Sequence, residues 1–194
     1  MSDSEAKCVY YGSVGPENTE RTLQLAYERA LELGIRHVLV ASTSGKTGAR
    51  AAEIMRDLDV VVVSHSTGFH APNEQRLQPQ YREAIDALDA RILTTQHALG
   101  GVGRAVRRKL GTYQLDEIIA FVLRNFCEGV KVACELTVMA ADAGLVPAGQ
   151  EIVAIGGTGS GADTAVVIRA ANSQDFFDLR VLEIICKPRL ASTR

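Results

Sequence analysis

One stretch, residues 37–55, constrains the fold of this chain more than any other. It reads HVLVASTSGKTGARAAEIM and opens with an apolar run, Val38–Ala41, that is rich in valine. A polar segment, residues 42–47, comes next, and small or apolar residues then recur at helical spacing up to Met55. This order predicts a buried strand that leads through a short polar loop into the N-terminus of a helix.

The polar loop in this stretch has the chemistry of an anion site. The first N–H groups of a helix have no partner within the helix, and the helix dipole adds a partial positive charge there. Four hydroxyl groups and one ammonium group accompany them, which is more than helix capping requires. An ordinary turn with a serine cap remains the alternative. The candidate binding residues are Ser42, Thr43, Ser44, Gly45, Lys46 and Thr47.

The loop is not a Walker A motif. That motif, GxxxxGK[ST], requires a glycine five residues before Gly45, and Val40 occupies the position. The GKT tripeptide is therefore only a fragment of the motif.

Composition limits the classes of protein that this chain can belong to. With 194 residues, 46% hydrophobic and 23% charged, it is long enough for one domain with its own core. The net charge of −2 gives no electrostatic argument for nucleic acid or an anionic membrane. Residues 1–7 are polar and acidic, which predicts a disordered tail and no signal peptide. The four cysteines are Cys8, Cys127, Cys134 and Cys186. They show no CxxC spacing, which favours reduced thiols in a cytoplasmic protein. Cys127 and Cys134 are predicted to share one helix face, which suggests that they pack in the core.

Strands and helices alternate along the chain and give way to consecutive strands near its end. The predicted strands are 8–11, 38–41, 60–63, 91–94, 151–155, 164–170 and 180–186. Helices are predicted from the N-cap Asn18 to Gly34, after the 42–47 loop, from Pro79, and over 115–143 with Gly129 at a bend or a close contact. This pattern predicts a single α/β domain over residues 1–194, a three-layer α/β/α sandwich whose sheet is mostly parallel with an antiparallel edge.

Three further polar segments follow predicted strands. Ligands of open parallel sheets bind outside the carboxyl ends of the strands, so we expect these segments to converge with residues 42–47 on one cleft. The candidates are Ser64, His65, Ser66, Thr67, Gly68 and Phe69 after the strand 60–63, His97 in the glycine-rich segment 95–103, and Gly156, Gly157, Thr158, Gly159, Ser160 and Gly161.

The glycine-rich segment 156–163 matches G-x-G-x-x-A by count, but it is not a dinucleotide fingerprint. That fingerprint requires a following helix and an acidic residue on the next strand, whereas residues 164–170 have a strand pattern. Glycines allow backbone N–H groups to approach a phosphate or a ring closely. A wide hairpin connection is the alternative.

The remaining chemical candidates are histidines and a basic run. His65 and His97 end strands, where they can contact a ring or act as acid or base near neutral pH; a purely structural role is the alternative. No histidine spacing supports a metal site. The run Arg104–Lys109 is either a solvated helix face or a clamp on a ligand phosphate or another subunit.

The loop 42–47, placed between a strand and a helix, resembles the effector-phosphate loop in the C-terminal domain of pyruvate kinase, where a Ser/Thr-x-Ser-Gly-x-Thr/Ser segment holds a sugar phosphate. The wider chain is similar to stand-alone proteins related to that domain. In those proteins a GPENT segment, here 15–19, precedes the first helix, and VASTSGKTGARAAE, here 40–53, has close counterparts. The resemblance covers roughly residues 10–188, and 156–163 resembles the loop that closes over the effector.

This resemblance implies a function. Members of the stand-alone family have been seen with flavin mononucleotide (FMN), which implies a flavin phosphate in the 42–47 loop and leaves oxidoreductase activity open. The alternative is a non-catalytic sensor or carrier of a phosphorylated metabolite, with a homo-oligomer as an option. Pyruvate kinase activity is not expected, because that chemistry uses a barrel domain for which 194 residues leave no room.

Overall fold

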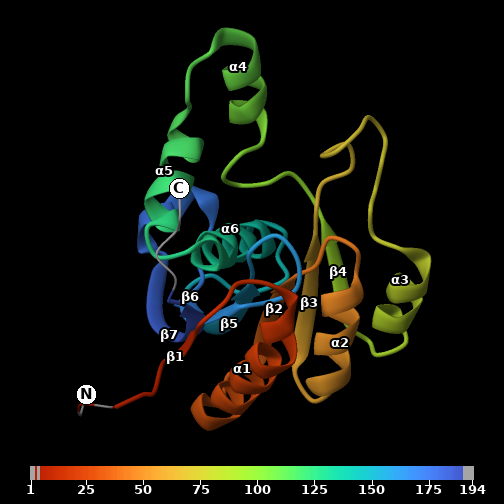
Figure 1. Cartoon of the computed structure of the whole chain (residues 1–194), viewed down its shortest axis with the longest axis vertical. Helices are drawn as coiled ribbons and strands as arrows, with labels where there is room; N and C mark the ends of the chain where they lie inside the picture. The colour runs from red at the N-terminus through yellow and green to blue at the C-terminus, as the bar shows by residue number, and fades with distance from the viewer. Residues whose placement is uncertain (1–2, 4, 190–194) are drawn as a thin grey trace.

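Seven strands form one sheet in the computed structural model, which describes residue 3 and residues 5–189 (Figure 1). In sheet order they are β1 (Val9–Tyr11), β7 (Arg180–Pro188), β6 (Thr164–Arg169), β5 (Glu151–Gly156), β2 (His37–Ala41), β3 (Asp59–Ser64) and β4 (Arg91–Thr94). All neighbouring strands pair in parallel except β6, which is antiparallel to both β5 and β7. The predicted sheet, mostly parallel with an antiparallel edge, is confirmed: the antiparallel pairs β5–β6 and β6–β7 lie toward the β1 end of the sheet.

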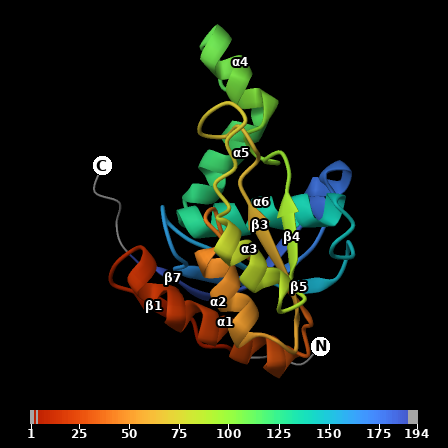
Figure 2. The ribbon, with the colours of Figure 1, turned by 90° about the vertical axis from the view of Figure 1, so that its right-hand side faces the viewer.

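Helices cover both faces of the sheet because its strands are apolar on both faces. Side chains alternate between faces: Val38 and Val40 join one core cluster, and Leu39 joins the other. The helices α1 (Thr19–Leu33), α2 (Lys46–Ile54) and α3 (Pro79–Asp86) lie on the first face, and α6 (Glu128–Asp142) lies on the second (Figure 2). The predicted three-layer α/β/α architecture is therefore confirmed.

Two helices extend beyond the sheet. Figures 1 and 2 show α4 (Val102–Leu110) and α5 (Leu115–Arg124) as an arm that projects from the layered body. The short 3₁₀ helices η1 (Pro16–Asn18) and η2 (Ser173–Asp178) complete the regular structure of the described residues.

Most predicted element boundaries agree with the structure. The predicted C′ residue, Gly34, ends α1 with a φ of 66°, and Pro79 begins α3. Asn18 is the N-cap residue of α1, but its side-chain amide donates to the carbonyl of Ser13 instead of capping the helix. The predicted tail, residues 1–7, lies partly outside the described residues, and residues 5–7 have no helix or strand.

The predicted single helix over 115–143 is wrong, because residues 125–127 separate α5 from α6. Gly129 lies in the first turn of α6, not at the bend. A Cβ there would lie 2.3 Å from the Cβ of Thr164, so this glycine permits close packing of α6 on β6. Cys127 precedes α6 in extended backbone, so it does not share a helix face with the buried Cys134 as predicted.

Two observations concern the state of the cysteines and the possibility of a membrane-spanning helix. All four cysteines are free thiols. In the part of the chain that the structure describes, no helix has the length and apolar character needed to cross a bilayer.

Candidate functional site

A cavity of about 540 Å³ opens where β2, β3 and β5 end. This volume is typical of small-molecule sites, and the position agrees with the rule for open parallel sheets. The predicted site residues that line it are Ser42, Thr43, Ser44, Thr47, Ser64, His65, Phe69, His97, Gly157, Gly159, Ser160 and Gly161. The predicted convergence of the four segments is therefore observed.

Other predicted residues do not line this cavity. Lys46 is exposed, so its ammonium group is not part of the cavity wall. Gly45, Gly156 and Thr158 support the loops without lining it, and Ser66, Thr67 and Gly68 line a second, adjacent pocket.

The 42–47 loop is fixed by close packing. Gly45 has a φ of 94°, and a Cβ added to it would lie 2.6 Å from the Cβ of Tyr81 in α3. The hydroxyl oxygen of Ser42 accepts the N–H of Gly48 at 3.1 Å, which satisfies one free donor of the first turn of α2. The carbonyl of Ser44 accepts the N–H of Gln78 at 3.0 Å. The loop is thus held in one conformation without any ligand contact.

Two hydroxyl groups of this loop have no acceptor. Among the described residues, no protein group accepts a hydrogen bond from the hydroxyl of Ser44 or Thr47. Both residues line the cavity at the N-terminus of α2. These donors and the helix dipole favour a negatively charged group on the ligand.

The glycine loop 156–161 is tied to the GPENT segment through a buried carboxylate. Asp163 is fully buried, and its Oδ2 accepts the N–H groups of Gly15 and Thr158, each at 3.1 Å. Gly161, with a φ of 70°, would place a Cβ 2.5 Å from the Cα of Pro16. Gly159 differs, because a Cβ added to it would meet no atom within 4 Å and because it lines the cavity. Gly159 therefore lies where the loop borders open space in the cavity.

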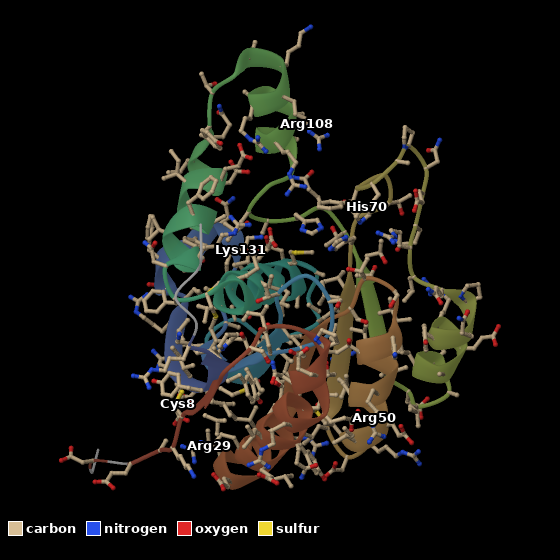
Figure 3. The ribbon with its side chains drawn as sticks, viewed as in Figure 1. Cys8, Arg29, Arg50, His70, Arg108 and Lys131 are labelled. Atoms are coloured by element: carbon tan, nitrogen blue, oxygen red, sulfur yellow. The ribbon has the colours of Figure 1, made fainter. Side chains whose placement is uncertain are left out.

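An aromatic and histidine cluster closes one side of the cavity. The ring centroid of Phe69 lies 4.4 Å from that of His65 and 4.9 Å from that of His97, with the latter pair stacked. The guanidinium carbon of Arg104 lies 4.6 Å from the Phe69 centroid. Nε2 of His65 lies 3.2 Å from the hydroxyl of Thr43, and its Nδ1 lies 3.3 Å from Nε2 of His70. Figure 3 shows His70 on the loop that faces α4 across the site.

The environment of His65 keeps its imidazole neutral at physiological pH. Burial lowers the pKa of His65 to about 4, and the nearby His97 and His70 act in the same direction. This favours a role for His65 in ring contact and hydrogen bonding over proton transfer near neutral pH.

Helix α6 contributes a buried ionic wall that sequence reasoning missed. Nζ of Lys131 lies 2.6 Å from Oε2 of Glu135, and both side chains are 6% exposed. Oε2 of Glu135 is also 3.5 Å from Nδ1 of His97, and its Oε1 accepts the N–H of Leu99 at 3.0 Å. Burial alone would raise the pKa of Glu135, but His97 and Lys131 outweigh it and lower that pKa to about 2. Nε2 of His97 is buried and has no partner among the described residues.

A sequence signal for this wall existed. Glu128, Lys131 and Glu135 recur at spacings of three and four in an otherwise apolar helix, which places them on one face. Further residues outside the predicted set that line the cavity are Arg76, Gln78, Arg124, Glu128, Lys131, Val132, Glu135, Leu136 and Met139. Within residues 3 and 5–189, no group of three His, Cys, Asp or Glu side chains could hold a metal ion.

The fold and the site together define a class: α/β domains with a cavity at the carboxyl ends of a mostly parallel sheet. Residues 20–168 match the family described as pyruvate kinase, alpha/beta domain. The chain belongs to this family, which confirms the resemblance seen in its sequence. The match begins in α1 and ends in β6, so β1 and β7 lie outside it.

Proposed function

We propose that this protein binds FMN in the cavity, with the phosphate at the 42–47 loop. The observation that carries the proposal is the pair of hydroxyl groups of Ser44 and Thr47, which line the cavity at a helix N-terminus and have no acceptor in the described chain. No carboxylate occurs in this loop.

The rest of the cavity fits a flavin. Its volume, about 540 Å³, lies within the range of cofactor sites. Phe69 and His97 offer ring surfaces for stacking, and Leu136 and Met139 add apolar lining. The buried Nε2 of His97 lacks a hydrogen-bond partner in the described residues, and a polar ring edge would supply one. Bound flavin supplies redox chemistry, so the proposal includes a flavin-dependent oxidoreductase and no pyruvate kinase chemistry.

A non-catalytic sensor or carrier of a phosphorylated metabolite is the second candidate. It is favoured by the family match to the pyruvate kinase alpha/beta domain and by the polar side chains of Arg76, Gln78 and Lys131, which suit ligand hydroxyl groups. The visible absorption spectrum of the purified protein separates the candidates, because only bound flavin is yellow.

Ligand titration tests the phosphate assignment. We expect apo protein to bind FMN at least about 10-fold more tightly than riboflavin, and Ser44→Ala to weaken FMN binding about 10- to 100-fold through the loss of one charge-assisted hydrogen bond. Ser173→Ala, an exposed serine of η2 outside the cavity, is the matched control and should bind normally. Equal affinities for FMN and riboflavin would contradict the assignment.

The proposal extends to location and assembly. Free thiols and a net charge of −2 favour the cytoplasm and no nucleic-acid or membrane partner. Between residues 102 and 126, eight large apolar side chains are at least 49% exposed. This concentration of exposed apolar side chains favours a homo-oligomer. Light scattering coupled to size-exclusion chromatography measures its mass, and a monomer would contradict this part.

A further inference from the structure

A second pocket, of about 440 Å³, lies beside the large cavity, with Phe69, His97 and Arg104 common to both. Its walls are the segment 66–69, the segment 96–101 and helix α4. The 42–47 loop and the glycine loop do not line it. Apart from Phe69, His97 and Arg104, an occupant of this pocket therefore meets different groups from the ligand of the large cavity.

The structure divides the basic run of α4 into two sets. Arg104 and Arg108, one helical turn apart, line the second pocket, and neither forms a salt bridge within the described residues. In contrast, Nε of Arg107 lies 2.7 Å from Oε1 of Glu117 in α5. Arg108 and Lys109 are both exposed, but only Arg108 lines the pocket.

The lining of this pocket is positively charged. None of its lining residues there is Asp or Glu, whereas Glu128 and Glu135 line the large cavity beside Arg124 and Lys131. Figure 3 shows Arg108 on the side of α4 that faces the loop carrying His70. Gly100 lets the Arg104 side chain lie close, since a Cβ there would be 2.9 Å from its Nη2. Two such guanidinium groups around a hollow attract an anion.

We propose that this second pocket binds the diphosphate group of a small organic ligand. A guanidinium group holds a phosphoryl group through two parallel hydrogen bonds, so two arginines match two linked phosphoryl groups. Arg104 stacks on Phe69 and keeps its edge donors free, while Ser66 and Thr67 supply hydroxyl groups from the facing wall. The organic part of the ligand then lies against Phe69, next to the large cavity.

The test measures inorganic pyrophosphate binding by calorimetry in the Ser44→Ala background, where the first loop is impaired. We expect one pyrophosphate per chain and at least about 10-fold weaker binding of inorganic phosphate. Adding Arg108→Ala should weaken pyrophosphate binding about 10-fold or more, and adding Lys109→Ala should change it less than about 2-fold. Both substitutions remove one positive charge from α4, so the difference isolates contact from general electrostatics.

The outcome of this pyrophosphate test does not depend on whether the protein binds FMN. In the parent protein Arg108→Ala should leave FMN affinity unchanged, and pyrophosphate should bind whether or not FMN does. Equal losses for Arg108→Ala and Lys109→Ala would overturn the proposal and leave a nonspecific basic surface. Absence of pyrophosphate binding would overturn it as well.

Discussion

Two walls of the large cavity are built in different ways. The sheet-side wall, residues 42–47 and 157–161, consists of loops that follow β2 and β5, and it presents hydroxyl groups and backbone amides. The helix-side wall, residues 124–139, belongs mainly to α6 and presents the ion pairs Arg124–Glu128 and Lys131–Glu135. One wall is neutral and rich in donors, and the other is ionic.

The two walls are also stabilised differently. Glycines with positive φ and tight contacts, such as Gly45 and Gly161, fix the sheet-side wall. The helix-side wall depends on charges that are buried together, Lys131 with Glu135. Substitutions should therefore damage the first wall through backbone strain and the second through an unpaired charge.

The largest expected effect is on the helix-side wall. Glu135→Ala leaves the ammonium group of Lys131 buried without its carboxylate and frees the N–H of Leu99, so we expect a loss of about 3–5 kcal/mol in the free energy of unfolding. Urea unfolding measures this loss. The double variant Lys131→Met/Glu135→Leu should recover most of it, because no unpaired charge remains. A double variant as unstable as the single one would show that the lost hydrogen bond to Leu99 dominates.

A smaller effect is expected for the sheet-side wall. Gly45→Ala combines an unfavourable φ of 94° with a Cβ that would lie 2.6 Å from Tyr81, so we expect a loss of about 2–4 kcal/mol. Gly34→Ala is the matched control, because Gly34 has a φ of 66° with open space around its Cβ position, and it should lose only about 1 kcal/mol. Equal losses in urea unfolding would mean that packing against α3 contributes nothing.

The two walls also differ in how far the sequence predicted them. The sheet-side wall followed from local patterns, since an apolar run, a polar loop and a helical period together identify a strand end, and strand ends of a parallel sheet lie at one edge. The same rule found His65 and Phe69. It could not exclude Lys46 or Thr158, because the direction of a loop side chain depends on backbone angles that residue types do not determine.

The helix-side wall could not be predicted in the same way. The apolar pattern continues from α5 to α6 without a glycine or proline at residues 125–127, so the two helices were predicted as one. The contact between His97 and Glu135 joins residues far apart in sequence, so no local period reveals it. Only the spacing of charges along α6 was visible, and a solvated helix face gives the same spacing.

The open edge of the glycine loop allows a finer test of the sheet-side wall. Gly159 and Gly149 have φ values of 78° and 84°, and neither has an atom within 4 Å of its Cβ position. Gly159→Ala and Gly149→Ala should each cost about 1 kcal/mol of stability through backbone strain. Only Gly159 lines the cavity, so only its variant should weaken FMN binding, by about 10-fold. If the two variants bind FMN equally well, the glycine loop only connects β5 and β6 and does not contact the ligand.

The smallest expected effect is a pH dependence in which the histidine cluster and the helix-side wall have separate windows. The folded-state pKa of His65 is lowered to about 4 and that of Glu135 to about 2, below their unfolded values of about 6.5 and 4.3. A lowered folded-state pKa means that the unfolded chain binds more protons, so stability falls as pH falls. Protonation linked to His65 should lower the free energy of unfolding from about pH 6.5 downward. Glu135 should add to this loss only below about pH 4.5.

Because His65 is partly exposed, solvent screening limits its share to about 1 kcal/mol or less over the whole window. His65→Gln should flatten the free energy of unfolding between about pH 6.5 and 4.5 without changing the fall below about pH 4.5. Chemical unfolding at fixed pH values measures both windows. If His65→Gln keeps the parent slope in the upper window, another group carries the proton and the cluster of His65, His70 and His97 does not hold His65 neutral.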